Sequence, residues 1–237
     1  MYSVYSTQFI MPLSHLSVVN IAPDLADQVH AKLRDALTTG EIAPGERLTQ
    51  EDLAEKLAVS RQPVLQALRV LKKEGFVVDA PGRGLMAAPL DARTLEQLYS
   101  VRGALDALAA RLAAVQVAAG GATLDAGLIA RGRKAAQGGR MSAMIDADTA
   151  FHHAIYAASG NPLIAESAER HWHHIRRAMG AVLRDSPSRT AVWDEHAAIL
   201  QAIAQGDAAL AERLARDHGE VAGRNLAEQL GKALRAA

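Results

Sequence analysis

Four side chains in the C-terminal half of the sequence have the types and spacings that could hold a metal ion. Asp148 and His152 are four residues apart, so on a helix both point to the same spot. His196 lies ten residues before Gly206 and His218 twelve after it, so two antiparallel helices turning at Gly206 would bring these imidazoles to nearly the same height. Three imidazoles and one carboxylate suit a divalent ion such as Zn, Ni, Mn or Fe, with Zn expected in the isolated protein. Taken singly, each histidine could instead be a hydrogen-bonded core or surface residue.

Helices must carry these residues, and the apolar spacing after residue 89 predicts an all-α bundle of about six of them. The expected helices are separated by breaks that contain Gly, Pro or Asp. They cover Ala92 to Ala118, Leu124 to Gln137, Ser142 to Ser159, Pro162 to Arg184, Arg189 to Gln205 and Ala208 to Leu234. The segment Pro89-Leu90-Asp91 joins the bundle to what precedes it, and a joint this short can transmit motion.

Earlier in the chain, the stretch from Thr49 to Gly84 predicts a helix-turn-helix followed by a β-wing. Thr49 is placed to cap the first helix and Ser60 to cap the second, in whose first turn Pro63 is tolerated. A further amphipathic helix should pack behind this pair. This additional helix is expected over Asp24 to Thr39. The two wing strands are expected over Phe76 to Ala80 and Leu85 to Ala88, on either side of the turn Pro81-Gly82-Arg83-Gly84.

The polar face of the second helix carries residues that can read DNA. Gln62, Gln66 and Arg69 recur at helical spacing, and Arg61 stands at the N-terminal end. Arg suits guanine O6/N7 and Gln suits adenine N6/N7, and this end of the second helix meets base edges in helix-turn-helix proteins. Arg69 would contact phosphates, and Arg83 in the wing could reach the backbone or minor groove. An ordinary amphipathic helix pair also has a polar outer face, and that interpretation stays open.

Composition narrows the classes of protein. Among 237 residues, 49% are hydrophobic and the formal net charge is zero, so DNA binding must rest on local charge. Residues 23–55 hold three basic and eight acidic side chains, whereas residues 56–83 hold six basic and two acidic ones. The lack of Cys excludes disulfides and thiolate chemistry and fits a cytoplasmic protein. Residues 1–22 are too polar to span a membrane and lack the basic start of a signal peptide, so they predict a flexible tail, with Met11 as an alternative start.

The stretch LAEKLAVSRQPVLQALRVLKKEGFV with its PGRG turn closely resembles the winged helix of the GntR family of bacterial transcription regulators, which usually reads SRxPVREAL with a PxRG wing. Leu65 stands where that family usually has Arg, and Gln66 where it has Glu; Leu65 could pack on a thymine methyl group. The resemblance makes Arg47, in the connecting turn of residues 42–48, either a phosphate contact or an exposed loop charge. The expected DNA contacts are Arg47, Arg61, Gln62, Leu65, Gln66, Arg69, Arg83 and Gly84.

The segments DADTAFHHAIYAASGNPLI, DEHAAILQAI and ARDHGEVAGRNL resemble the FCD effector domain of the FadR-like branch of that family. Some relatives bind acyl chains without metal, but metal-binding members use an Asp and three His. By this resemblance the ligands are Asp148, His152, His196 and His218. Arg102 is similar to the arginine that reaches towards the bound effector, and a guanidinium suits a carboxylate. Asp106 stands where Glu is usual, and a helical salt bridge between Arg102 and Asp106 is the other interpretation of this arginine.

The motif HWHHIRR contains a second group of histidines, at positions 171, 173 and 174, beside Trp172. One or two of these imidazoles could line a cavity in the bundle. The other interpretation is that they lie on a polar face of a helix.

The resemblance implies three regions: a tail at residues 1–22, a winged helix-turn-helix DNA-binding domain at 23–89, and an all-α effector-binding and dimerisation domain at 90–237. It implies a homodimer on a pseudo-palindromic double-stranded DNA operator. The expected protein is a repressor with no enzymatic activity, whose DNA affinity falls when a small carboxylate binds near the metal and Arg102 and the helix from Ala92 shifts. Two alternatives remain. One is a metal-dependent hydrolase with a DNA-binding appendage, and the other is a regulator whose metal is structural or is itself the signal.

Overall fold

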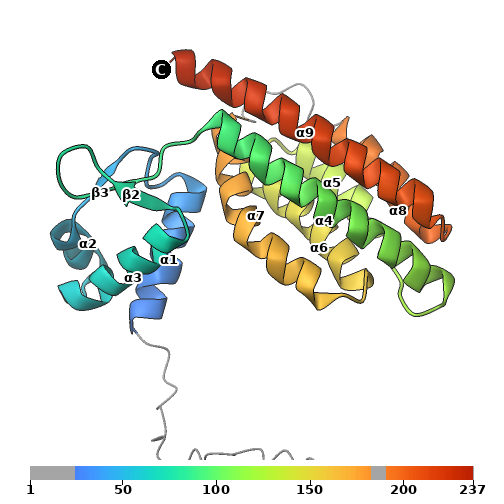
Figure 1. Ribbon diagram of the computed structural model, residues 1–237, viewed down its shortest axis with the longest axis horizontal. Helices are drawn as coiled ribbons and strands as arrows, with labels where there is room; N and C mark the ends of the chain where they lie inside the picture. Colours follow the sequence, from blue (N-terminus) through green and yellow to red (C-terminus); the bar gives the residue numbers. More distant parts are fainter. Residues whose placement is uncertain (1–24, 183–190, 237) are drawn as a thin grey trace, which may run out of the picture.

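The computed structural model describes residues 25–182 and 191–236, and its N-terminal part is a winged helix-turn-helix (Figure 1). The expected tail at residues 1–22, the start at Met11 and the helix ends at Arg184 and Arg189 lie outside the described residues. The elements in order are α1 (Leu25–Thr39), β1 (Arg47–Leu48), α2 (Gln50–Leu57), α3 (Arg61–Lys73), β2 (Val77–Asp79) and β3 (Leu85–Ala87).

Local sequence explains how the two helices of the reading unit begin and end. The Thr49 hydroxyl accepts a hydrogen bond from the Asp52 backbone N at 3.1 Å, which confirms the predicted cap of α2. Ala58 ends α2 with φ of 53°, so the chain turns sharply into α3. Ser60 occupies the predicted N-cap position of α3 in an extended conformation, although its side chain makes no cap hydrogen bond. The apolar faces of α1, α2 and α3 meet in one core that includes Leu37, Leu53, Val64, Leu68, Leu71 and Phe76.

A small sheet forms the wing, with strand order β1-β3-β2 and antiparallel pairing throughout. Val78 pairs with Met86, and Leu48 pairs with Leu85. The sequence predicted β2 and β3 but treated β1 as part of a connecting turn. Two residues cannot show a strand period, and β1 exists only because β3 supplies its hydrogen-bond partners.

The Asp91 carboxylate accepts from the Thr94 backbone N at 2.7 Å, and the described residues after it form helices joined by turns. The expected helix-turn-helix followed by a helical bundle is thereby confirmed as the fold class. The helices are α4 (Ala92–Ala118), α5 (Gly127–Gln137), α6 (Met141–Ala158), α7 (Pro162–Val182), α8 (Val192–Ala204) and α9 (Ala208–Ala236). Within residues 25–182 and 191–236, no helix is long and apolar enough to cross a lipid bilayer.

Small residues let the two longest helices, α4 and α9, run side by side (Figure 1). A Cβ atom on Gly219 of α9 would lie 2.9 Å from the Cα atom of Gly103 on α4, so the backbones touch there. Further along α4, alanines fill the interior. The bundle core nevertheless contains buried polar side chains, which are Arg102, Asp106, Asp148, His152, Ser159, Arg177, His196 and His218. Buried polar groups need partners, and most of these find them in one another.

Candidate metal centre and effector cavity

Three imidazoles from three helices converge in the middle of the bundle. His152 comes from α6, His196 from α8 and His218 from α9, and one ligand nitrogen of each lies within 4.8 Å of the others. The Nε2 atoms of His196 and His218 are 3.2 Å apart. Asp148, one turn before His152, brings its Oδ1 to 3.7 Å from the His196 Nε2. The structure therefore brings all four predicted ligand residues together.

Carboxylates behind two of the imidazoles fix which nitrogen faces inward. The His218 Nδ1 lies 2.7 Å from a Glu195 carboxylate oxygen, and the His152 Nδ1 lies 3.4 Å from Asp106 Oδ2. A carboxylate accepts hydrogen bonds, so Nδ1 carries the proton in each case and Nε2 presents a lone pair towards the centre. Outer carboxylates of this kind accompany metal-ligating histidines in proteins. The donor set and its orientation thus fit a divalent ion.

Burial favours the neutral form of two of the imidazoles, those of His152 and His196, as metal ligation requires. Desolvation lowers the pKa of His152, and the neighbouring Arg102 lowers it further. The pKa of His196, which is fully buried, lies well below the ordinary value, first because of desolvation and then because of His218 and His152.

Arg102 of α4 lies at the edge of this centre and makes the helical salt bridge with Asp106 that the sequence offered as one interpretation. Its Nε donates to Asp106 at 3.1 Å, which is the helical salt bridge. Its Nη2 lies 2.5 Å from the His152 Nε2 and 3.9 Å from Asp148 Oδ2. The guanidinium also lies over the ring of Trp172, 4.1 Å from its centroid. Although burial disfavours the charge, Asp106 and the other neighbours keep the pKa of Arg102 above its ordinary value, so it is a permanent cation.

Asp106 anchors this arginine and is itself anchored. The Tyr156 hydroxyl donates to Asp106 Oδ1, and Asp106 Oδ2 faces both Arg102 and His152. Burial raises the pKa of the Asp106 carboxyl, but His152, Arg102 and the hydrogen bonds outweigh it, so its pKa lies well below the usual range. Asp106 is therefore ionised and holds the arginine in place. The nearby Tyr99 stays protonated, because burial raises its pKa to about 12.

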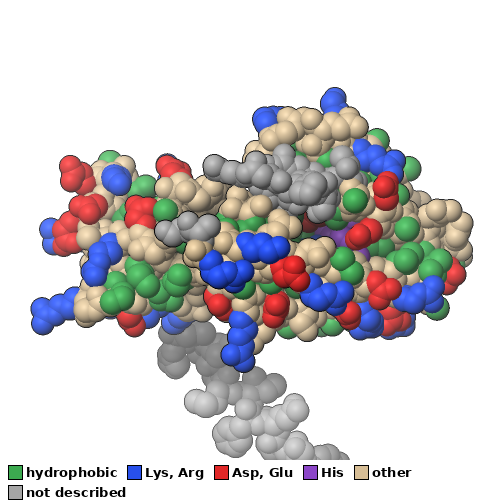
Figure 2. All heavy atoms as spheres, turned by 90° about the horizontal axis from the view of Figure 1, so that it is seen from above, with side chains coloured by type: hydrophobic (Ala, Val, Ile, Leu, Met, Phe, Trp, Pro, Cys, Tyr) green, Lys and Arg blue, Asp and Glu red, His purple; other side chains and the backbone are tan. Residues whose placement is uncertain are grey.

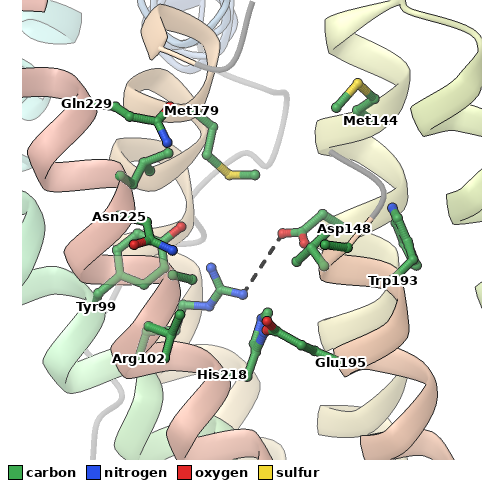
Figure 3. A pocket seen from close by; sticks show the side chains of 15 residues that line it. Tyr99, Arg102, Met144, Asp148, Met179, Trp193, Glu195, His218, Asn225 and Gln229 are labelled. Carbon is green, nitrogen blue, oxygen red and sulfur yellow. Dashed lines mark hydrogen bonds and ion pairs between the residues drawn. The ribbon is translucent and has the colours of Figure 1, made fainter. Parts of the chain in front are cut away.

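A cavity of about 130 Å³ opens directly beside the centre (Figure 3). Arg102, Asp148 and His218 form its floor, where a dashed line joins Arg102 to Asp148. Its walls combine apolar side chains with two amides on α9, and they include Tyr99, Met144, Met179, Trp193, Asn225 and Gln229. Figure 2, which views the molecule from above, shows histidine atoms at the surface among hydrophobic and charged side chains. The cavity thus has a charged floor and mainly apolar walls.

Gly132 of α5 allows the cavity residue Trp193 to pack where it does, because a Cβ atom on Gly132 would lie 2.0 Å from the Trp193 Cη2. We expect Gly132→Ala to lower the free energy of unfolding by about 1–3 kcal/mol, as overpacking does. Among the described residues, no atom outside the nearby backbone of α7 lies within 4 Å of the position that a Cβ would take on Gly180. We expect Gly180→Ala to be neutral or stabilising by up to about 1 kcal/mol. Urea unfolding measures both, and equal effects of the two substitutions would contradict the close contact.

The predicted DNA-reading residues occupy the solvent side of α3 and the wing. Gln62, Gln66 and Arg69 are exposed, whereas Leu65 is only partly exposed. Arg61 Nη1 pairs with Glu51 at 2.9 Å. Arg47 donates to the backbone oxygens of Pro81 and Arg83, at 2.9 Å each, so it braces the wing turn. Arg83 and Gly84 are exposed at the tip of that turn.

Sequence reasoning overlooked several residues of the site. Glu195, Trp172 and Tyr156 contact the predicted residues only through the packing of separate helices, and no spacing rule links them to the residues they touch. Asn225 and Gln229 did carry a signal, because two amides four residues apart share a helix face. Of the HWHHIRR histidines, His173 and His174 face Phe76 of the winged domain, away from the cavity.

Comparison with known proteins finds a matching family for each of the two parts of the chain. Residues 25–86 match the family described as "Bacterial regulatory proteins, gntR family", and residues 97–221 match the FCD domain. A transcriptional regulator in an unstable DNA locus of Streptomyces ambofaciens is 30% identical over 195 residues, covering 80% of each chain. The regulator McbR of Escherichia coli is 29% identical over 145 residues, covering 61% of this chain and 66% of McbR.

Among solved structures, that of E. coli McbR/YncC covers 90% of this chain and 99% of its own with a TM-score of 0.69. At 23% sequence identity, this likeness shows a shared fold and nothing more. The two relatives named above are described as transcription regulators.

Proposed function

This chain belongs to the GntR family of bacterial transcription regulators and carries an FCD domain. We propose that it is a metal-dependent repressor, and that it leaves its operator when a small carboxylate binds. The observation that carries the proposal is the position of Arg102, Asp148 and His218 on the floor of one cavity. A buried cation at the edge of a possible metal centre would attract a carboxylate and orient it.

Two copies of the chain would read a pseudo-palindromic operator on cytoplasmic DNA. The α3 helices of a two-fold dimer would enter successive major grooves, about 34–36 Å apart. Gln62 and Gln66 are exposed on one face of α3 and suit adenine edges. Arg69 and Arg83 are exposed nearby and would contact phosphates. Arg61, now paired with Glu51, could exchange that partner for DNA.

Asp148, His152, His196 and His218 would hold the divalent ion, with Zn, Ni, Mn and Fe all compatible with this donor set. A bound ion of this kind supplies a coordination position for a carboxylate oxygen. Arg102 would donate hydrogen bonds to the same carboxylate, and Asp106 holds that guanidinium in place. Asn225 and Gln229 offer further hydrogen bonds higher in the cavity.

The cavity volume of about 130 Å³ restricts the effector to a small molecule. An apolar cavity of about 150 Å³ in another protein accommodates benzene, so the effector body should be no larger than about one six-membered ring. This size argues against long acyl chains, which some relatives of this domain bind. We therefore expect a short or single-ring carboxylate.

Calorimetric titration with acetate, benzoate and octanoate, each on Zn²⁺-loaded protein, tests this proposal. Benzoate or acetate should bind, octanoate should bind more weakly, and methyl benzoate should not bind, because it lacks the anionic carboxylate. The bound acid should also release labelled operator DNA. Tighter binding of octanoate than of both smaller acids would contradict the proposed effector class.

Glu195 should support the metal centre although it is no ligand, because it holds His218 with Nε2 facing inward. We expect Glu195→Gln to weaken Zn²⁺ binding by about 10–100-fold, the usual effect of losing such an outer partner. The matched control is Glu220→Gln on α9, where Glu220 pairs only at 3.9 Å with Arg224 on the surface. Competition with a chelating dye measures both affinities. Equal affinities of the two variants would show that Glu195 does not position His218.

A further inference from the structure

Helix α7 is the part of the bundle that faces the winged domain (Figure 1). The His174 ring stacks on the Phe76 ring at a centroid distance of 4.3 Å and an angle of 14°. Its Nε2 donates to the backbone oxygen of Glu74 at 2.9 Å. Arg177, one turn further along, donates to the backbone oxygen of Ala88. We call His174 and Arg177 the clamp.

The clamp holds the backbone at both ends of the wing. Glu74 and Phe76 lie between α3 and β2, and Ala88 directly follows β3. Phe76 is 2% exposed and belongs to the core of the winged domain. Because that core is closely packed, a displacement of the Phe76 ring would shift the side chains that pack against it. Gly75, at φ of +82°, lets the chain pass close to His174, whose Cε1 would lie 3.6 Å from a Cβ there.

The opposite face of the same helix touches the metal centre. Trp172 and His174 are two residues apart, so their side chains point in nearly opposite directions. The Trp172 ring lies under the Arg102 guanidinium and 5.4 Å from the His152 ring, centroid to centroid. Met179, two turns after Trp172, lines the cavity. One rigid helix therefore contacts both the site and the reading domain.

A second link ties α7 to the helix that carries Asp148 and His152. The Arg176 guanidinium of α7 donates to Asp146 at 2.6 Å and to Thr149 at 3.2 Å, and these residues flank Asp148 on α6. A shift of Asp148 would therefore act on α7 from this side as well as through Trp172.

We infer that α7 transmits occupancy of the site to the DNA-reading domain, with Trp172 as the sensing contact and the clamp as the output. This inference rests on the proposed function and names its route of regulation. A cation held by the His152 Nε2 would take the lone pair that now accepts from Arg102. The Nη2 end of the guanidinium would then shift over the Trp172 ring, while its Nε stays on Asp106. A movement of α7 would follow, and with it a change in the hold of the clamp on residues 74–76 and 88.

Hydrogen exchange of the full chain, read by mass spectrometry, tests the route, and calorimetry on the same samples measures Zn²⁺ binding. In the wild type, Zn²⁺ should change the exchange of residues 74–88 by about fivefold or more, the lower end of ordinary allosteric coupling. His174→Ala should bind Zn²⁺ with unchanged affinity and lose this response. The matched control is His171→Ala, three residues earlier on α7, which should keep the response.

Arg102→Met is a second perturbation that needs no metal, because it removes the guanidinium from Trp172. It should alter exchange at residues 74–88 in an otherwise wild-type chain and leave it unaltered in His174→Ala. If His174→Ala is too unstable, Arg177→Met cuts the other contact of the clamp and should also weaken the response. A wild-type protein that does not bind Zn²⁺ would overturn the metal proposal, and the Arg102→Met comparison would still decide the route. The inference is overturned if residues 74–88 respond equally with and without the clamp.

Discussion

Replacing His196 with alanine is expected to lower the affinity for Zn²⁺ by more than about 100-fold. Loss of an outer partner of a ligating histidine costs about 10–100-fold, and His196 is placed to be a ligand itself. Its Nε2 lies 3.2 Å from the His218 Nε2 and 3.7 Å from Asp148, so it stands at the middle of the cluster. Equilibrium competition with a chelating dye gives the affinity, and metal analysis of the purified variant gives the content.

The matched control is His153→Ala, one residue beyond His152 on α6, because the His153 Nε2 only approaches Glu169 at 3.7 Å outside the cluster. It should bind Zn²⁺ like the wild type. Thermal unfolding of His196→Ala distinguishes the roles of the metal. A folded variant whose operator binding ignores carboxylates indicates a regulatory ion, whereas an unfolded effector domain indicates a structural one. Zn²⁺ affinity unchanged in His196→Ala would contradict the proposed centre.

Replacing Gln62 and Gln66 together with alanine is expected to weaken selective operator binding strongly. Each bidentate contact to a base contributes about 1–3 kcal/mol of discrimination, so losing two should weaken binding to the operator by about 30-fold or more. Binding to unrelated DNA should change little, because phosphate contacts carry it. Fluorescence anisotropy with the operator and a scrambled duplex measures both quantities.

Arg69→Ala provides the contrasting result for a phosphate contact. It should weaken binding to both duplexes alike and reduce the dependence of log affinity on log salt by about one. Gln201→Ala, an exposed glutamine on α8, is the neutral control. If the double glutamine variant lost affinity equally for both duplexes, α3 would contact only the DNA backbone and the sequence would be read elsewhere.

Elements with strong local signals were predictable from the sequence. Asp91 caps α4 through Thr94, and the helix covers Ala92 to Ala118 as expected. Strand β1 had no such signal, because it depends on pairing with β3, which is distant in the sequence. Ser60 is the N-cap residue of α3 as predicted, yet it makes no side-chain cap hydrogen bond, because the residue type permits that bond but does not require it. Local chemistry therefore predicts where helices begin better than which contacts their caps make.

In the candidate site, too, the sequence predicted what depends on local spacing and missed what depends on packing between distant helices. Asp148 and His152 could be paired from spacing, and the turn at Gly206 aligned His196 with His218. Contacts between helices that no short turn joins could not be predicted. The Arg102 guanidinium meets Asp106 in its own helix but also Trp172 and His152 from two others. The salt bridge with Asp106 is confirmed, and the role of Arg102 in effector binding stays a prediction.

The most direct test of the central claim measures the fluorescence anisotropy of a labelled DNA duplex from upstream of the protein's own gene. A scrambled duplex is the comparison, and both are titrated with Zn²⁺-loaded protein at one near-physiological salt concentration. Salt is held fixed because phosphate contacts make the affinity depend on it. We predict that the native duplex binds about a thousandfold more tightly and that a small carboxylate reduces this preference. Equal binding of both duplexes, unaltered by any carboxylate that fills the cavity, would contradict the account.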